Sequence, residues 1–142
     1  MMMGDAPDPT AGGAPPNSET RAKRLLVMDD EAAFGRFVRR IAEGEGYEVE
    51  VLTVPRAFAE TYERFAPAVV VLDVVMPEID GIELIRWLIA RQANIKLIVM
   101  TGFNPMYATM GAILAEAHGL MEVTSVVKPI GVADLRKLLA TT

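Results

Sequence analysis

The chain has 142 residues, of which 51% are hydrophobic, so it is long enough for one domain and apolar enough for a packed core. Its net charge of −5 argues against direct binding to nucleic acid, which depends mainly on Lys and Arg side chains that contact phosphates. It has no cysteine, which excludes disulfides, zinc–thiolate sites and thiol nucleophiles and fits a reducing cytoplasm.

Residues 1–22 differ in composition from the rest of the chain. They are rich in Pro and Gly and, after the opening Met residues, hold almost no large apolar side chain. Such a segment cannot offset its ordering entropy by burial, so we expect a flexible tail at 1–22 and one folded domain at 23–142. The opening residues do not resemble a secretion signal, and no apolar run approaches the ~18 residues of a membrane span. We therefore expect a cytoplasmic protein with no membrane association.

Strands and helices are expected to alternate from residue 24 onward. The strands are short apolar runs, and the helices carry apolar residues three or four positions apart. In chain order we predict a strand at 24–28, a helix at 31–43, a strand at 47–52, a helix capped by Thr53 with Pro55 near its first turn, a strand at 68–72, a helix at 81–92, a strand at 96–100, a helix opened by Asn104-Pro105 and ended by Gly119, a strand at 123–127 and a helix at 132–140.

This alternation predicts an α/β fold with a doubly wound parallel sheet. Short loops between alternating elements require right-handed crossovers, which place helices on both faces of the sheet. The commonest solution at this size is the flavodoxin-like (βα)5 arrangement with strand order 2-1-3-4-5. In that arrangement the ligand site lies at the carboxyl ends of the first and third strands.

Four of the expected strands end in residues that carry chemistry. The first runs into Asp29 and Asp30, and the third into Asp73. The fourth is followed by Thr101, and the fifth by Lys128-Pro129. Parallel strands bring such residues to one edge of the sheet, so we expect carboxylates, a hydroxyl and an ammonium to form one cluster that handles a phosphoryl group.

Three neighbouring carboxylates repel one another unless they take up protons or bind a cation. Oxygen ligands without His or Cys indicate Mg²⁺, or Mn²⁺ in its place. We expect Asp29, Asp30 and Asp73 to hold this ion, together with the backbone carbonyl of Val75. The ion would offset the charge of a phosphoryl oxygen.

Asp73 stands alone at the end of the central strand and is the candidate nucleophile that forms an aspartyl phosphate. Thr101 can donate its hydroxyl to one phosphoryl oxygen, and Lys128 can place its positive charge at another. A cis bond before Pro129 would aim the ammonium. Each residue also has a simpler interpretation: Asp29 or Asp30 can cap the helix that follows, and Thr and Lys-Pro are frequent in turns.

At these positions the chain resembles the receiver domain of bacterial two-component response regulators. The matching segments are 27–31, 71–81, 99–102 and 126–129, and the most specific is the Asp-x-x-Met-Pro-x-x-Asp-Gly string that begins at Asp73. The resemblance implies that Asp73 takes a phosphoryl group from a histidine kinase or a histidine phosphotransfer protein. It also implies that Asp29 and Asp30 hold Mg²⁺, with Asp30 the more direct ligand, and that Thr101 and Lys128 sense the phosphorylated state.

The chain departs from the receiver pattern near the switch residues. Receivers usually carry Tyr or Phe three residues before the Lys, whereas this chain has Ser125, so the usual coupling between Thr and the aromatic residue is in doubt. Val75 and Phe103 occupy the positions that flank the path of hydrolytic water in receivers. Neither can hydrogen-bond water through its side chain, so we predict slow self-dephosphorylation.

The predicted fourth helix is apolar on nearly all sides, with Glu116 as its only carboxylate. Either a homodimer mate or target protein covers the surface formed by this helix, the fifth strand and the fifth helix, or the helix is simply buried more deeply. His118, the only histidine, is expected at the end of this helix without a catalytic role.

Three functions fit the sequence to different degrees. The first is a stand-alone receiver that signals through altered protein–protein interactions. The second is a degenerate receiver that binds a partner without phosphorylation, for which Ser125 is the argument. The third is an aspartyl-phosphate phosphatase similar to haloacid dehalogenases, which need a second Asp two residues after the nucleophile. Val75 occupies that position, which argues against the phosphatase.

Overall fold

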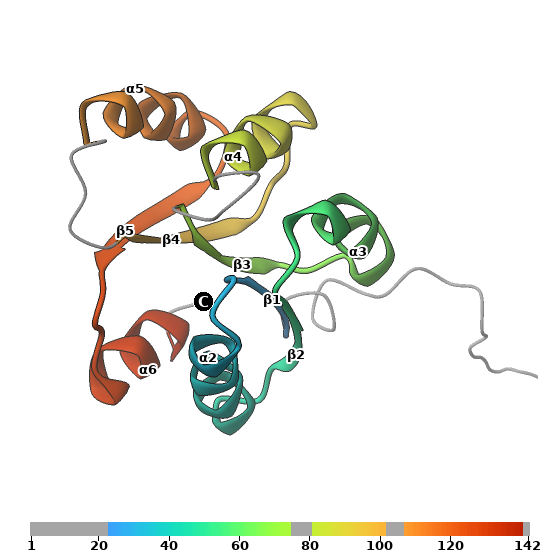
Figure 1. Ribbon diagram of the computed structural model, residues 1–142, viewed down its shortest axis with the longest axis vertical. Coiled ribbons are helices and arrows are strands. Elements are labelled where there is room, and N and C mark those ends of the chain that lie inside the picture. The colour runs from blue at the N-terminus through green and yellow to red at the C-terminus, as the bar shows by residue number, and fades with distance from the viewer. Residues whose placement is uncertain (1–22, 75–80, 102–106, 141–142) are drawn as a thin grey trace, which may run out of the picture.

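The computed structural model describes residues 23–74, 81–101 and 107–140, without the side chains of 101 and 107–112. Five parallel strands form one sheet in the order β2-β1-β3-β4-β5 (Figure 1). The strands are Arg24–Met28 (β1), Glu48–Leu52 (β2), Val69–Asp73 (β3), Lys96–Thr101 (β4) and Glu122–Val127 (β5). The flavodoxin-like fold and the strand order predicted from the sequence are confirmed.

Helices cover both faces of the sheet. They are Ala32–Gly44 (α2), Phe58–Phe65 (α3), Gly81–Ala90 (α4), Tyr107–His118 (α5) and Val132–Ala140 (α6), and a short 3-10 turn, Pro55–Ala57 (η1), precedes α3. Helices α2 and α6 lie on one face, and α3, α4 and α5 lie on the other (Figure 1). Within the described parts of the chain, every helix is too short or too polar to span a lipid bilayer.

The central strands are buried along their whole length because both of their faces are covered by helices, and all their residues except Arg24 and Asp73 are apolar. All five residues of β1 and all five of β3 are buried. On β1, Leu25 and Val27 belong to the core under α2 and α6, whereas Leu26 and Met28 belong to the core under α3, α4 and α5. Alternate residues of each strand thus serve opposite layers, which is the pattern of a buried parallel sheet.

The helix expected after Thr53 begins later than predicted. Pro55 opens the η1 turn, and α3 itself starts at Phe58 with Ala57 as its N-cap and no side-chain cap hydrogen bond. The prediction that Thr53 caps this helix is wrong. The residue before a proline is held in extended conformation, as Val54 is here, so Thr53 lies outside the first turn.

The other helices follow the sequence pattern closely. Helix α6 has the predicted bounds, and α2 begins one residue later than predicted and ends one residue later. Helix α5 ends at His118, next to the predicted stop at Gly119. The Asn104-Pro105 start of that helix and the tail at 1–22 lie outside the described residues.

Candidate functional site

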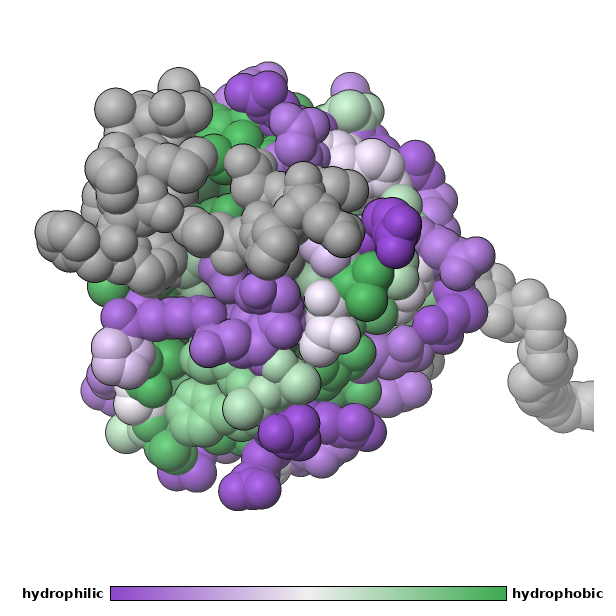
Figure 2. Space-filling model, in the orientation of Figure 1, coloured by the Kyte–Doolittle hydropathy of each residue, from purple (hydrophilic) through white to green (hydrophobic). Residues whose placement is uncertain are grey.

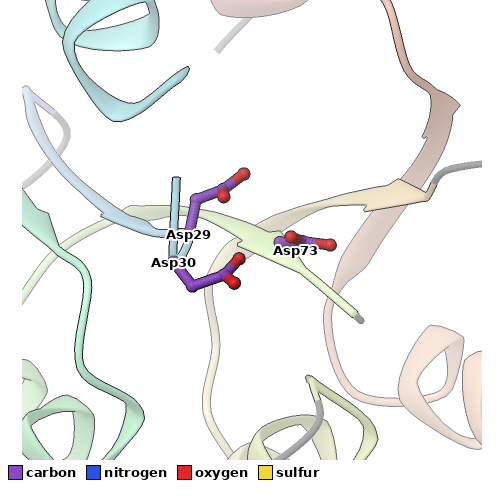
Figure 3. A group of neighbouring side chains, drawn as sticks. All are labelled: Asp29, Asp30 and Asp73. Carbon is purple, nitrogen blue, oxygen red and sulfur yellow. The ribbon is translucent and has the colours of Figure 1, made fainter. Parts of the chain in front are cut away.

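Three carboxylates converge at the carboxyl ends of the two central strands. Asp29 and Asp30 follow β1, and Asp73 is the last residue of β3, which pairs with β1 through Met28 and Leu72. Their side chains lie near one another, with Asp29 and Asp30 just after β1 and Asp73 on the last residue of β3 (Figure 3). One oxygen from each of the three lies within 4.8 Å of the others. This is the juxtaposition that the strand-end pattern predicted.

The donor set suits a hard divalent cation. Asp29 is 1% exposed and Asp73 is 7% exposed, while Asp30 is exposed to solvent. Carboxylates this close require a compensating positive charge, and oxygen ligands favour Mg²⁺ or Mn²⁺. Val75, whose carbonyl was expected to complete the set, lies outside the described residues.

Asp29 is held by two hydrogen bonds. Its Oδ1 accepts from the backbone N–H of Glu31 at 2.8 Å, directly before α2 begins, and its Oδ2 accepts from Lys128 Nζ at 2.7 Å. The alternative that Asp29 caps this helix is wrong, because the N-cap of α2 is Glu31 with no side-chain cap hydrogen bond, and Asp29 accepts only from the N–H of that N-cap residue. Because both oxygens of Asp29 are engaged, the exposed Asp30 is the more accessible ligand for an incoming ion.

Lys128 supplies the positive charge of the cluster. It follows the end of β5, and its Nζ lies 2.7 Å from Asp29 Oδ2, 3.5 Å from Asp73 Oδ2 and 3.7 Å from Glu31 Oε1. Burial lowers the pKa of Lys128, but the hydrogen bond to Asp29 and the charges of Asp73, Asp29 and Glu31 outweigh it, so the pKa is raised above 10.5. The ammonium is therefore charged at neutral pH.

The remaining predicted switch residues lie on the neighbouring strands. Thr101 ends β4, adjacent in sequence to Met100, which pairs with Asp73, but its side chain lies outside the described part. Ser125 is exposed on β5 and pairs with Val99. The Lys128–Pro129 peptide bond is cis, as the sequence suggested. Phe103 lies outside the described residues.

Two residues near the site had no role predicted for them, although Gly81 is the last residue of the string that begins at Asp73. The ring of Phe34, on the first turn of α2, lies 4.3 Å from Lys128 Nζ, measured to the ring centroid. Gly81 opens α4 and donates its N–H to the carbonyl of Val74, and a Cβ at this position would lie 2.4 Å from the carbonyl oxygen of Asp73. Phe34 follows Asp30 by four residues, but its helical spacing gives no sign of the cation beside it.

The described end of α5 packs partly on the sheet. Ile113 and Ala117 are buried, whereas Glu116 and His118 are exposed. This part of the helix therefore has the polar outer face that the sequence did not make evident. On the adjoining strand, Val127 is 52% exposed.

The chain is similar to known signalling proteins over almost its whole described length. The family model for the response regulator receiver domain matches residues 25–140. Chemotaxis protein CheY from Thermotoga maritima is 33% identical over 96 residues, which cover 67% of this chain and 80% of that protein. The KDP operon transcriptional regulatory protein KdpE from Escherichia coli is 33% identical over 116 residues, covering 81% of this chain and 48% of KdpE. The chain thus spans about half the length of this second relative.

Solved structures show the same fold. A CheY-like receiver domain from Methanospirillum hungatei matches with a TM-score of 0.72 at 24% identity, covering 84% of this chain and 91% of that one. The beryllofluoride-activated NtrC4 receiver domain, solved as a dimer, matches with a TM-score of 0.69 at 26% identity, covering 84% of this chain and 94% of that one.

Proposed function

The chain belongs to the response regulator receiver domain family, and from this premise we propose that Asp73 accepts a phosphoryl group from a histidine kinase or a histidine phosphotransfer protein. The observation that carries the proposal is the meeting of three carboxylates and the Lys128 ammonium at one edge of the sheet. The proposal concerns this domain and the signal it carries.

In the proposed transfer, an oxygen of the Asp73 carboxylate forms a bond to phosphorus. The bond between phosphorus and the donor's imidazole nitrogen breaks, and that nitrogen keeps the electron pair. Lys128, 3.5 Å from Asp73 Oδ2, is close enough to stabilise the charge on a phosphoryl oxygen attached there. Thr101, at the end of the neighbouring strand, is proposed to donate its hydroxyl to a second oxygen.

We further propose that transfer depends on Mg²⁺, or Mn²⁺ in its place. Asp29, Asp30 and Asp73 would hold the ion, with the carbonyl of Val75 as a fourth ligand. A bound divalent ion supplies positive charge where the carboxylates and the phosphoryl oxygens would otherwise repel one another.

The proposed output is a changed protein–protein interaction. The surface formed by α5, β5 and α6 is the candidate for a homodimer mate or a target protein, and the exposed Val127 lies on it. Ser125 stands where receivers usually carry an aromatic residue. A change at Thr101 on phosphorylation is therefore proposed to alter this surface through residues other than the one at position 125. Because Val75 and Phe103 are apolar, the prediction of slow self-dephosphorylation stands as a proposal: phosphorylated protein should not lose its label within seconds when no phosphatase is present.

Labelling with a small phosphodonor tests the assignment of Asp73. The protein is incubated with acetyl phosphate and Mg²⁺, the acyl phosphate is trapped by borohydride reduction, and the modified peptide is mapped by mass spectrometry. We expect modification at Asp73 in wild type, with no label in Asp73→Asn or after addition of EDTA. A wild-type protein that stays unlabelled would favour a degenerate receiver that acts only by binding.

A further inference from the structure

The ring of Phe34 provides Lys128 with a partner that is not an acid. Its centroid lies 4.3 Å from the ammonium nitrogen, within the range of a cation–π interaction. Phe34 is partly buried on the first turn of α2, and its ring packs against that of Phe37 at 5.8 Å between centroids. The two rings form an apolar pair on one helix, and a leucine at position 37 would keep an apolar neighbour beside Phe34.

Every other described partner of the ammonium is a carboxylate. Asp29 and Asp73, at 2.7 and 3.5 Å, also belong to the acid cluster that fits a divalent cation. Glu31, at 3.7 Å, is 71% exposed, so solvent screens its pull. If Asp73 is phosphorylated and Asp29 turns toward a cation, the charges that hold Lys128 change. The Phe34 ring has no ionisable group, so its attraction for the ammonium stays the same when these charges change.

We propose that Phe34 is a positioning residue that keeps the Lys128 ammonium at the acid cluster while its carboxylate partners change. The lysine stem has four flexible carbons, and fixing it at the moment of transfer would cost conformational entropy. A cation already placed beside Asp73 meets the phosphoryl oxygen without that cost. This inference rests on the proposed function, because it assigns Phe34 a part in the same transfer.

The Phe34 ring and the Lys128 side chain border the same open hollow. An open hollow of about 450 Å³ lies beside α2 and is lined by Glu31, Phe34, Phe37, Lys128, Pro129 and Ile130. Apolar side chains gather over α2 and the neighbouring α6 (Figure 2). Without the ring, Lys128 would be free to swing from Asp73 into this hollow.

Matched variants separate the aromatic face from simple packing. Phe34→Leu keeps an apolar side chain but removes the ring, Phe34→Tyr keeps the ring, and Phe37→Leu removes the adjacent ring that faces no cation in the described structure. We expect Phe34→Leu to slow phosphorylation of Asp73 by acetyl phosphate about two- to fivefold, the range of a partly exposed cation–π contact. Phe34→Tyr and Phe37→Leu should stay near the wild-type rate.

A spectroscopic readout tests the contact itself without phosphoryl transfer. The ring current of Phe34 should shift the Cε protons of Lys128 upfield in wild type, and this shift should persist in Phe34→Tyr and vanish in Phe34→Leu. Equal rates in wild type and Phe34→Leu, or no ring-current shift in wild type, would overturn the role of Phe34. Equal losses in Phe34→Leu and Phe37→Leu would indicate packing alone and would also overturn it. Failure to label wild type at Asp73 would instead refute the proposed function.

Discussion

Replacing Asp73 with Asn should stabilise the metal-free protein, because it removes one charge from a crowded set of three. At an effective dielectric constant of about 20, two unit charges 4.8 Å apart repel by about 3.5 kcal/mol, and the attraction across 3.5 Å to Lys128 is about 4.7 kcal/mol. Among the charges of Asp29, Asp30, Asp73 and Lys128 alone, two repulsions are relieved and one attraction is lost. Since solvent screens the exposed Asp30, we expect the free energy of unfolding to rise by about 1–2 kcal/mol.

Urea unfolding in EDTA and in Mg²⁺ measures this change. Trp87 is the only tryptophan, and it packs edge-on against Phe58 and Tyr62, so its fluorescence reports loss of the core. Mg²⁺ should stabilise wild type more than Asp73→Asn, because the variant lacks one of the proposed ligands. A matched surface change, Glu116→Gln, should leave the free energy of unfolding almost unchanged both in EDTA and in Mg²⁺. The reasoning is refuted if Asp73→Asn is less stable than wild type in EDTA and Mg²⁺ stabilises both equally.

Two further substitutions test the supports of the site. Lys128→Met removes the ammonium that faces the buried Asp29 and should lower the free energy of unfolding by about 2–3 kcal/mol in EDTA at neutral pH. Because the pKa of Lys128 is raised in the fold, its stabilisation is complete below pH 10.5 and is lost as pH rises through the folded-state value, so wild type and variant should converge in strongly alkaline urea titrations. Gly81→Ala places a Cβ 2.4 Å from the Asp73 carbonyl oxygen and should cost about 1–3 kcal/mol and weaken beryllofluoride binding. Gly131→Ala, with nothing within 4 Å of the added Cβ, is its control and should bind beryllofluoride normally.

The strand ends were predictable because a parallel sheet leaves little freedom. The run of four apolar residues that leads to Asp73 in β3 is typical of a strand covered on both faces, and parallel strands align their carboxyl ends at one edge. The convergence of Asp29, Asp30 and Asp73 therefore followed from where two apolar runs stop, at the ends of β1 and β3, and from the strand order. The structure agrees with the predicted strand ends and with the predicted strand order.

Side-chain contacts across the sheet were harder to predict. One oxygen of Asp29 accepts a hydrogen bond from the N–H of Glu31 and the other accepts one from Lys128. The sequence could not show the second of these bonds, because residues 29 and 128 are distant in the chain. The contact of Phe34 with Lys128 was not predicted because helical spacing defines an apolar face but not the cation lying over it. The error at Thr53 had a local cause, since Pro55 opened a 3-10 turn before the helix.

Titration with beryllofluoride and Mg²⁺, followed by amide NMR shifts, tests the central claim most directly. Beryllofluoride mimics a phosphoryl group on a carboxylate. If Asp73 is esterified beside a shared cation and the Lys128 ammonium, wild type should show saturable shifts around Met28, Asp73 and Lys128, and Asp73→Asn should show none. The same shifts in Asp73→Asn, or no response in wild type, would contradict the account.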